Sequence, residues 1–522
     1  MKNIVLIALL SAAIISCKKV PHPVNDLHDS GKEKANVEDS LKTAYKTKFS
    51  NVLAKALAAD QDLRAFIKTE ALKEFDKDHD VLFLTTANKL IGGESFKVKL
   101  LKYGLSTAEL EQILNNLPTM TILVPTVPNF SPENWNTRSE VPKVAISPNG
   151  KEFESISVVD AEGKVNQIKK GLIPGYPIVI VKENERIAVS RGASVQAAAG
   201  SYITTTSGGI TLKFVDKAYD GRSTDNRKDG GFQIAREVDT LYDTNPIDPR
   251  VITAFKKGVE WHSDYIYYGI DPANGVTRGP INSKYREYIR SFRMSNTEWS
   301  DIADQDDPRY NGNTPSGRPP FPQQPYYWTD GAYDFRIDVM INAKNGAGQV
   351  LRKAFSARGH ELYNINFVAD GTSGNYRISS VDTKEFFVNE AIDAWDLDAY
   401  GSTWKFTVYE FDPAEEVEYT ITNTTKFGSN FEINATGEKV KVGAKFGGSF
   451  EETKTTSTTV KRTLDSDYLG EGILNFHDPI IVRYRYIDKV GGRPYRRHLW
   501  DTWEVNAGLV RISVEPRDIT NL

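Results

Sequence analysis

Residues 333–342 read YDFRIDVMIN, a run in which apolar and polar side chains alternate. Four apolar side chains fall at every second position: Phe335, Ile337, Val339 and Ile341. Successive side chains of a β-strand point to opposite faces of the sheet, so this spacing predicts a half-buried strand with one face on a core and one in water.

The same period of two recurs through the C-terminal part of the chain. Further segments of this kind are residues 404–408, 417–421, 440–444, 480–487 and 498–505. The last two flank Gly491-Gly492, a pair typical of a hairpin turn. Many short strands with turn residues between them are typical of antiparallel sheets. We therefore expect residues 331–522 to form an antiparallel, β-sandwich-like domain.

The N-terminal part has a different periodicity. Apolar residues between Leu41 and Leu57 recur at steps of three or four, which predicts an amphipathic helix, and a second helix is expected after Asp60. Ser106 and Glu109 have the spacing of a capping box that begins a third helix. Short β-type runs follow between residues 119 and 181. We expect residues 37–190 to form one α+β domain.

Between these two regions the sequence is irregular. Residues 192–208 are small and polar, as in a linker or exposed loop. Residues 210–330 contain aromatic segments at 264–269 and 285–292, both predicted as strands, and end in a proline-rich stretch at 311–325. The whole chain is therefore predicted to be β-rich α+β.

Composition limits the partners that the chain is expected to bind. The formal net charge of the 522 residues is −4, which is close to neutral for this size. A nearly neutral chain has no general attraction for nucleic acid. We expect no nucleic-acid partner.

The first 17 residues have a pattern with a specific meaning. One basic residue, Lys2, precedes the apolar run at 4–15, and Ile14-Ile15-Ser16-Cys17 follows. The run is too short to span a bilayer and is typical of a secretory signal. The four residues resemble the lipobox of bacterial lipoproteins, in which the chain is cleaved before the cysteine and the cysteine is lipidated.

This resemblance implies a signal peptide at 1–16 and a lipid anchor on Cys17, the only cysteine of the chain. We expect residues 17–36, which contain proline, glycine and charge, to form a tether. In similar lipoproteins an aspartate after the cysteine favours the inner membrane. Residue 18 is a lysine, so we expect a lipid-anchored protein of the bacterial cell envelope, at the outer membrane, in either leaflet.

Sequence motifs for catalysis are absent. There is no Gly-x-Ser-x-Gly, no phosphate-binding loop and no His-Glu-x-x-His, and the histidines beyond the tether are far apart. We expect no cofactor, with one weak candidate for calcium. Carboxylates that could serve as oxygen ligands occur at Asp301, Asp304, Asp306 and Asp307, but they do not follow an EF-hand pattern.

The segment 480–505 is the strongest candidate for a binding surface. Arginine next to tyrosine and tryptophan is common in recognition patches, because rings give contact area and arginine gives directed hydrogen bonds. The candidate residues are Arg483, Arg485, Tyr495, Arg496, Arg497, Trp500 and Trp503. On one strand, Arg483 and Arg485 should share one face, with Tyr484 and Tyr486 on the other.

The sequence therefore favours a binding or structural role at the envelope, with a glycan or a protein as ligand. Two alternatives remain open. One is a hydrolase of envelope or extracellular polymers. The other is a pore-forming protein, since the Thr/Ser-rich residues 438–460 resemble the inserting region of aerolysin-type toxins.

Overall fold

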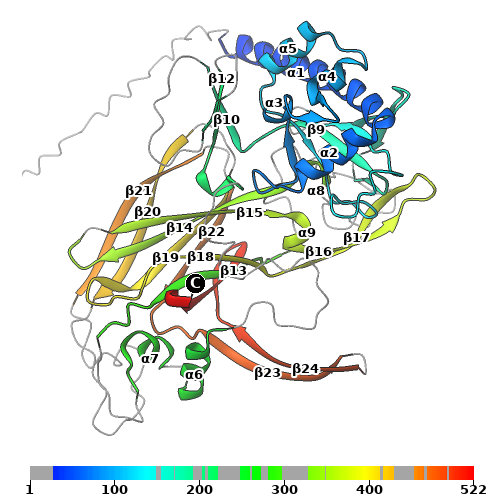
Figure 1. The fold of residues 1–522 in the computed structure, drawn as a ribbon. Helices are drawn as coiled ribbons and strands as arrows, with labels where there is room; N and C mark the ends of the chain where they lie inside the picture. Colours follow the sequence, from blue (N-terminus) through cyan, green and yellow to red (C-terminus); the bar gives the residue numbers. More distant parts are fainter. Residues whose placement is uncertain are drawn as a thin grey trace, which may run out of the picture.

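The protein is a β-rich α+β chain, 23% helical and 48% strand, as the sequence predicts. Its fold is given by a computed structural model (Figure 1). The model describes residues 27–148, 155–169, 171–191, 203–205, 210–221, 247–258, 261–271, 280–296, 302, 327–346, 348–411, 416–427, 452–463, 467–490 and 493–521.

The N-terminal body contains a mixed six-stranded sheet with helices packed against it (Figure 1). The strand order is β1-β4-β9-β5-β6-β7, and only β5 and β9 are parallel. The strands are β1 (Asp80–Leu82), β4 (Met120–Leu123), β5 (Lys143–Ile146), β6 (Ser155–Val159), β7 (Val165–Lys169) and β9 (Ile178–Glu183). The helices are α1 (Leu27–Ala59), α2 (Gln61–Ala71), α3 (Phe83–Thr86), α4 (Phe96–Leu101) and α5 (Thr107–Asn116). A short hairpin joins β2 (Leu90–Ile91) to β3 (Glu94–Ser95).

The helix predictions for this body are confirmed. The apolar side chains of α1 from Phe49 to Leu57 are buried against the sheet, although Leu41 at the predicted start of that face is exposed. Asp60 caps α2, and Ser106 and Glu109 form both hydrogen bonds of the predicted capping box. One boundary differs. The helix α1 already begins at Leu27, so residues 27–36 are helical where an extended tether was expected.

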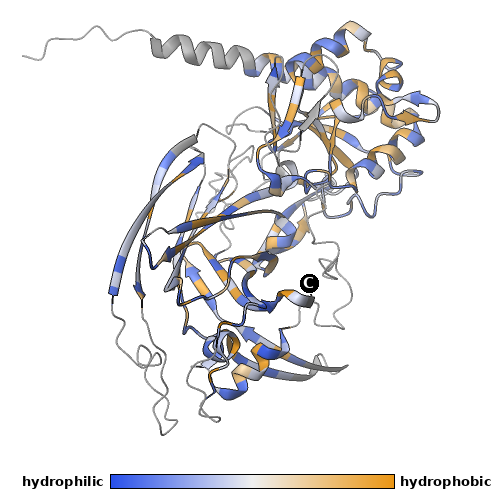
Figure 2. Cartoon of the chain, turned by 60° about the vertical axis from the view of Figure 1, so that its left-hand side comes forward, coloured by the Kyte–Doolittle hydropathy of each residue, from blue (hydrophilic) through white to orange (hydrophobic). Residues whose placement is uncertain are grey.

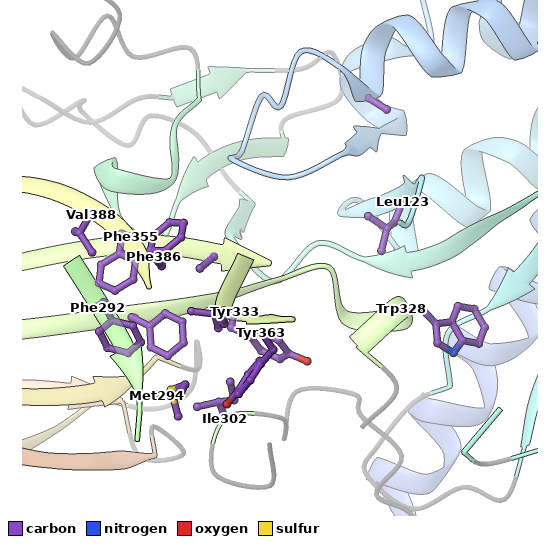
Figure 3. Close-up of a cluster of buried hydrophobic side chains, with 14 of the residues drawn as sticks. Leu123, Phe292, Met294, Ile302, Trp328, Tyr333, Phe355, Tyr363, Phe386 and Val388 are labelled. Carbon is purple, nitrogen blue, oxygen red and sulfur yellow. The ribbon is translucent and has the colours of Figure 1, made fainter. Parts of the chain in front are cut away.

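The C-terminal part forms two four-stranded antiparallel sheets. The first has the order β18-β13-β26-β25 and the second the order β15-β14-β19-β22. Strands of the first sheet are β13 (Tyr285–Met294), β18 (Phe386–Ala391), β25 (Glu504–Ala507) and β26 (Val510–Asp518). Strands of the second are β14 (Ala332–Ala343), β15 (Gln349–Arg358), β19 (Tyr400–Glu410) and β22 (Tyr468–Asn475). The aromatic residues Phe292, Phe335 and Phe355 join the two sheets, with ring centroids 4.8 to 5.3 Å apart. Phe292 and Phe355 are labelled in Figure 3.

Smaller elements connect these parts. Three short strands of the middle region, β10 (Ile187–Arg191), β11 (Ile203–Thr205) and β12 (Ile210–Phe214), form their own sheet. A second small sheet joins β8 (Ile173–Pro174) to the hairpin of β16 (Tyr363–Ala369) and β17 (Asn375–Thr383). The remaining helices are α6 (Pro249–Lys257), α7 (His262–Tyr268), α8 (Tyr327–Asp330) and α9 (Gly359–Leu362), with short 3₁₀ turns at Lys217–Tyr219 and Ile519–Asn521.

Strand β14 is buried on both faces, so the prediction of a half-buried strand is wrong. Each charged side chain on its second face has a charged or polar partner. Asp338 accepts hydrogen bonds from Arg352 and from the hydroxyls of Tyr409 and Tyr419, and Arg336 pairs with Asp216 at 3.3 Å. Buried charges need such partners, because desolvation is otherwise costly. The polar half of the alternation thus faces a second layer of protein.

Part of that layer is a two-stranded ribbon of β20 (Glu416–Phe427) and β21 (Glu452–Thr463). Its outer face has a row of hydroxyl pairs, of which Thr422–Ser457 and Thr424–Thr455 lie 2.9 and 2.7 Å apart. Its inner face is apolar at Ile421 and Phe427, which are buried. The Thr-rich segment therefore includes an ordered strand. The rest of the pore-forming candidate, residues 438–451, lies outside the described residues.

The middle region departs from two predictions. Residues 264–269 were expected to be a strand, but His262–Tyr268 form the helix α7, ended by Gly269 in the left-handed conformation. Strand β13 is confirmed, but it lies between β18 and β26 inside the C-terminal sandwich. The expected domain boundary at residue 330 therefore cuts through one sheet. The proline-rich stretch at 311–325 lies outside the described residues.

At one position where the two sheets meet, the backbone conformation and a neighbouring carbonyl group leave room only for glycine. Gly470 in β22 has φ +136°, and a Cβ atom there would lie 2.2 Å from the carbonyl oxygen of Ala507 in β25. We expect Gly470→Ala to lower the free energy of unfolding by about 2–3 kcal/mol, because backbone strain and a steric clash add. Urea denaturation measures this change.

Gly346 is the matched control. It also has a positive φ, +92°, but a Cβ there would meet no atom within 4 Å. We expect Gly346→Ala to cost only the backbone penalty, about 1 kcal/mol. Equal losses for the two variants would show that the seam between the sheets adjusts freely, contrary to the prediction.

Candidate functional site

Within the predicted segment 480–505, residues 481–502 form a hairpin that extends away from the sandwich (Figure 1 and Figure 2). Its strands are β23 (Ile481–Val490) and β24 (Arg493–Thr502), which pair with each other and with no other strand that the structure describes. Tyr484 lies opposite Trp500, and Tyr486 lies opposite His498. The predicted hairpin is confirmed, and each of its faces has a distinct character.

One face of the hairpin has a continuous row of rings, which we call the aromatic row: Trp500, Tyr484, His498 and Tyr486. Ring centroids are 4.6 Å apart for Tyr484–Trp500, 5.7 Å for Tyr484–His498 and 5.1 Å for Tyr486–His498. The Tyr484 hydroxyl lies 2.5 Å from Nδ1 of His498. Tyr484 and Tyr486 are 40% and 52% exposed, so the row faces solvent.

The opposite face is polar. Arg483 and Arg485 both donate to the carboxylate of Asp501, at 2.5 and 2.5 to 3.1 Å. The pKa of Asp501 is lowered: burial opposes the shift, but the hydrogen bonds from Arg485 and Arg483 outweigh it. The two arginines therefore share one partner. They lie on the face opposite the two tyrosines, as the alternation of the strand predicts.

The body supports the base of the hairpin. Phe255 of α6 packs edge-on against Trp500 at 5.7 Å and contacts His262 at 5.9 Å. Nδ1 of His262, which is buried, accepts the backbone N–H of Ile480 at 2.9 Å. These contacts hold the residue before β23 and the inner end of the aromatic row against helices α6 and α7.

The sequence-predicted surface is divided by this geometry. Arg483 and Arg485 lie on the polar face, Trp500 lies in the aromatic row, and Trp503 follows β24 with 39% exposure. Tyr495, Arg496 and Arg497 belong to β24, and their side chains lie outside the described part of the structure. Sequence reasoning missed His498 and Phe255 as members of the cluster, since only the cross-strand register and the packing of α6 reveal them.

Other predicted site residues lie outside the described residues: Cys17, Asp301, Asp304, Asp306 and Asp307. Within the part of the chain that the structure describes, no group of three or more His, Cys, Asp or Glu side chains is arranged to hold a metal ion. In that same part, no helix combines the length and the apolar character needed to cross a bilayer.

A second cluster, which the sequence did not suggest, is buried where the N-terminal body meets the sandwich. We call it the junction cluster: Asp76, Asp78, Asp80, Asn184, Arg186, Asp334 and Arg358. Asp78 accepts from the backbone N–H of Ala332 at 2.8 Å and from Arg358 at 3.2 Å, and Arg186 donates to Asp334 at 3.0 Å. Asn184 donates to both Asp76 and Asp80, at 2.5 and 3.1 Å. The cluster therefore joins the two bodies of the protein.

The carboxylates of the junction cluster titrate differently. Burial acts to raise the pKa of Asp78, but Arg358 and Arg186 hold it well below its usual range. Burial raises the pKa of Asp334 to about 6 in spite of Arg186. Burial also raises the pKa of Asp80, and Asp76 and Asp78 add to that rise. The alternation of aspartates at 76, 78 and 80 is no signal for this cluster, because residues 75–79 form turns and bends, with Lys77 at φ +71°, and β1 begins only at Asp80.

A small pocket beside this cluster brings together two of the predicted isolated histidines. His79 and His360 line it with Arg358 and Trp328, and its volume is 20 Å³, the room that a single water molecule needs. His79 is hydrogen-bonded to Glu74 at 3.1 Å. Burial and Arg358 act to lower the pKa of His79, but Glu133 and Glu74 raise it above its usual value. The pocket is too small for a polymer substrate.

Comparisons with known proteins add no relative. No protein-family model matches the chain, and neither a curated protein nor a solved structure matches it.

Proposed function

We propose that the chain is a lipid-anchored protein of the bacterial envelope that binds a ligand through the hairpin β23–β24. The observation that carries the proposal is the aromatic row, which is exposed on an element that extends from the body and pairs with none of the other described sheets. Exposed aromatic rings held in a fixed array are typical of recognition surfaces, because they give contact area at a small cost in side-chain entropy.

The lipobox supports the envelope location in this proposal. A diacylglycerol on Cys17, with an acylated amino group, would give three acyl chains, and each buried methylene adds about 0.8 kcal/mol to membrane binding. The helix α1 begins ten residues beyond that cysteine, at Leu27. The short segment between Cys17 and Leu27 would then connect the folded body to the membrane and keep it close to the membrane surface.

A Cys17→Ala variant tests the location. We expect the wild-type chain to incorporate a labelled fatty acid and to stay in the membrane fraction, and the variant to do neither, because the thiol is the acceptor of the lipid. Fractionation of cells with detection of label and protein gives the result. A variant that remains fully membrane-bound would contradict a lipid anchor.

Protease treatment of intact cells then separates the two possible leaflets. Digestion of the wild-type chain in intact cells would place the hairpin outside the cell, among extracellular ligands. Digestion only after the outer membrane is opened would place it in the periplasm, among envelope ligands. Either result is compatible with ligand binding by the hairpin. Variants of the aromatic row that bind every ligand as well as the wild type does would contradict this binding role.

A further inference from the structure

We infer that the aromatic row binds an extended chain of neutral sugars, a conclusion that rests on the proposed function. The four rings form two cross-strand pairs, Tyr484 with Trp500 nearer the base of the hairpin and Tyr486 with His498 two residues further out, and their centroid distances lie between 4.6 and 5.7 Å. At about 3.3 Å per residue the two pairs lie about 7 Å apart along the ribbon, so each pair can contact a separate ring of a sugar chain. The inner end of the row is closed by Phe255.

The shape of the hairpin favours a chain over a globular partner. Each strand has ten residues. At about 3.3 Å per residue and about 5 Å per strand, a two-stranded ribbon of this length offers a face of roughly 300 Å². A stable protein–protein interface buries about 800 Å² on each partner. A polymer that lies along the ribbon needs no more area than this face provides.

The charge of the described part of this face favours a neutral ligand. Its side chains there, Tyr484 and Tyr486 on β23 and His498 and Trp500 on β24, include no carboxylate and no guanidinium. The nearest arginines, Arg483 and Arg485, lie on the opposite face and share the carboxylate of Asp501. Phosphate or uronate groups would require free cations on the binding face, since such ligands gain most of their affinity from ion pairs.

The aromatic row can contact both the apolar C–H face and the hydroxyl groups of a sugar ring. A pyranose with equatorial substituents has an apolar C–H face, which packs on a flat aromatic ring, and a rim of hydroxyl groups. Trp500, Tyr484 and Tyr486 offer the flat rings, and the phenol hydroxyls and the His498 imidazole offer hydrogen-bond donors and acceptors at the edge of the row.

The experiment measures binding of the mature protein in detergent micelles to soluble polysaccharides. The neutral probes are xylan, β-glucan, mannan and dextran, and the acidic probes are alginate and polygalacturonate. Affinity electrophoresis with calorimetry gives the constants. We expect binding to at least one neutral probe, and we expect Tyr484→Ala with Tyr486→Ala to weaken it about tenfold or more, because central aromatic contacts dominate such surfaces.

Tyr468→Ala is the matched control, because Tyr468 of β22 is 50% exposed but lies outside the hairpin. It should bind like the wild type, and both variants should keep the wild-type unfolding midpoint.

Other outcomes overturn the inference in distinguishable ways. Binding only to acidic probes, lost in Arg483→Ala with Arg485→Ala, would place recognition on the polar face. Binding of a peptide or protein that requires Tyr484 and Tyr486 would refute a sugar ligand and leave the proposed function standing. Binding of any ligand that is equal in the hairpin variants and the wild type would refute both.

Discussion

Arg186→Met should lower the free energy of unfolding by about 3–5 kcal/mol, because the substitution leaves buried carboxylates without their cation. Arg186 is fully buried. Its guanidinium donates to Asp334 at 3.0 Å, to Glu185 at 2.7 Å and to the carbonyl oxygen of Ala332. Methionine fills most of the volume and removes all of these donors. Denaturation in urea, followed by tryptophan fluorescence, measures the loss.

A surface arginine provides the control for this prediction. Arg377 pairs with Asp370 at 3.0 Å, but its side chain is 58% exposed. We expect Arg377→Met to change stability by less than about 1 kcal/mol, since water screens an exposed pair. Equal effects of the two substitutions would mean that the junction cluster is hydrated and contributes little to the contact between the two bodies.

A second variant separates the loss of the cation from the loss of packing. Asp334→Asn removes one carboxylate that Arg186 neutralises while keeping a group that can accept the hydrogen bond from Ser356. In the double variant Arg186→Met with Asp334→Asn, part of the loss should return, because one of the uncompensated charges is gone. A double variant as unstable as the sum of the two single variants would show that Asp334 does not act through Arg186.

Local periodicity was enough to predict much of the secondary structure. The capping box at Ser106, the helical face from Phe49 to Leu57 and the alternation of β14 each depend on neighbours within a few residues. The segment 264–269 was misassigned, because its aromatic residues suit a strand, whereas Gly269 permits the left-handed end of a helix. In the folded protein Tyr267 and Tyr268 of this helix pack against Phe476, a residue far away in the sequence, and the local sequence does not show this contact.

The candidate site was predictable only in part for the same reason. The opposite faces of Arg483 and Tyr484 follow from the alternation of a single strand. The placement of Trp500 beside Tyr484 depends on the register between two strands, which a bulge near Ile481 shifts. The junction cluster depends on contacts between residues such as Asp78 and Arg358, from separate bodies of the fold. A single sequence contains no local signal for such contacts.

The pH dependence of stability offers a test inside the sandwich, at Glu287 of β13. This side chain is buried, and burial raises the pKa of its carboxyl to about 8, although hydrogen bonds from Tyr267 and Trp395 act to lower it and the charge of Glu515 acts to raise it. The Tyr267 hydroxyl donates to it at 3.1 Å. The charges of Arg290 and Arg517 are directed to Glu515, at 3.2 and 2.7 Å. The carboxyl of Glu287 is therefore favoured in its neutral form.

A raised carboxyl pKa makes the folded state bind its proton more tightly than the unfolded chain does. The contribution of Glu287 to stability is then fully present below its ordinary pKa of 4.5 and is lost as the pH rises toward 8. Glu287→Gln should therefore resemble the wild type near pH 5 and exceed its free energy of unfolding by about 3–5 kcal/mol near pH 9. Glutamine accepts the same two hydrogen bonds and does not ionise.

Urea denaturation of both proteins at several pH values between 5 and 9 measures the difference. Other titrating groups cancel in the comparison, because the two chains share them. Glu111→Gln, on the exposed side of α5, is the matched control and should follow the wild type at every pH. If Glu287→Gln also follows the wild type throughout, the carboxyl of Glu287 titrates in the folded protein as it does in the unfolded chain. Water or a cation would then have to reach the interior of the sandwich between β13, α7 and β26.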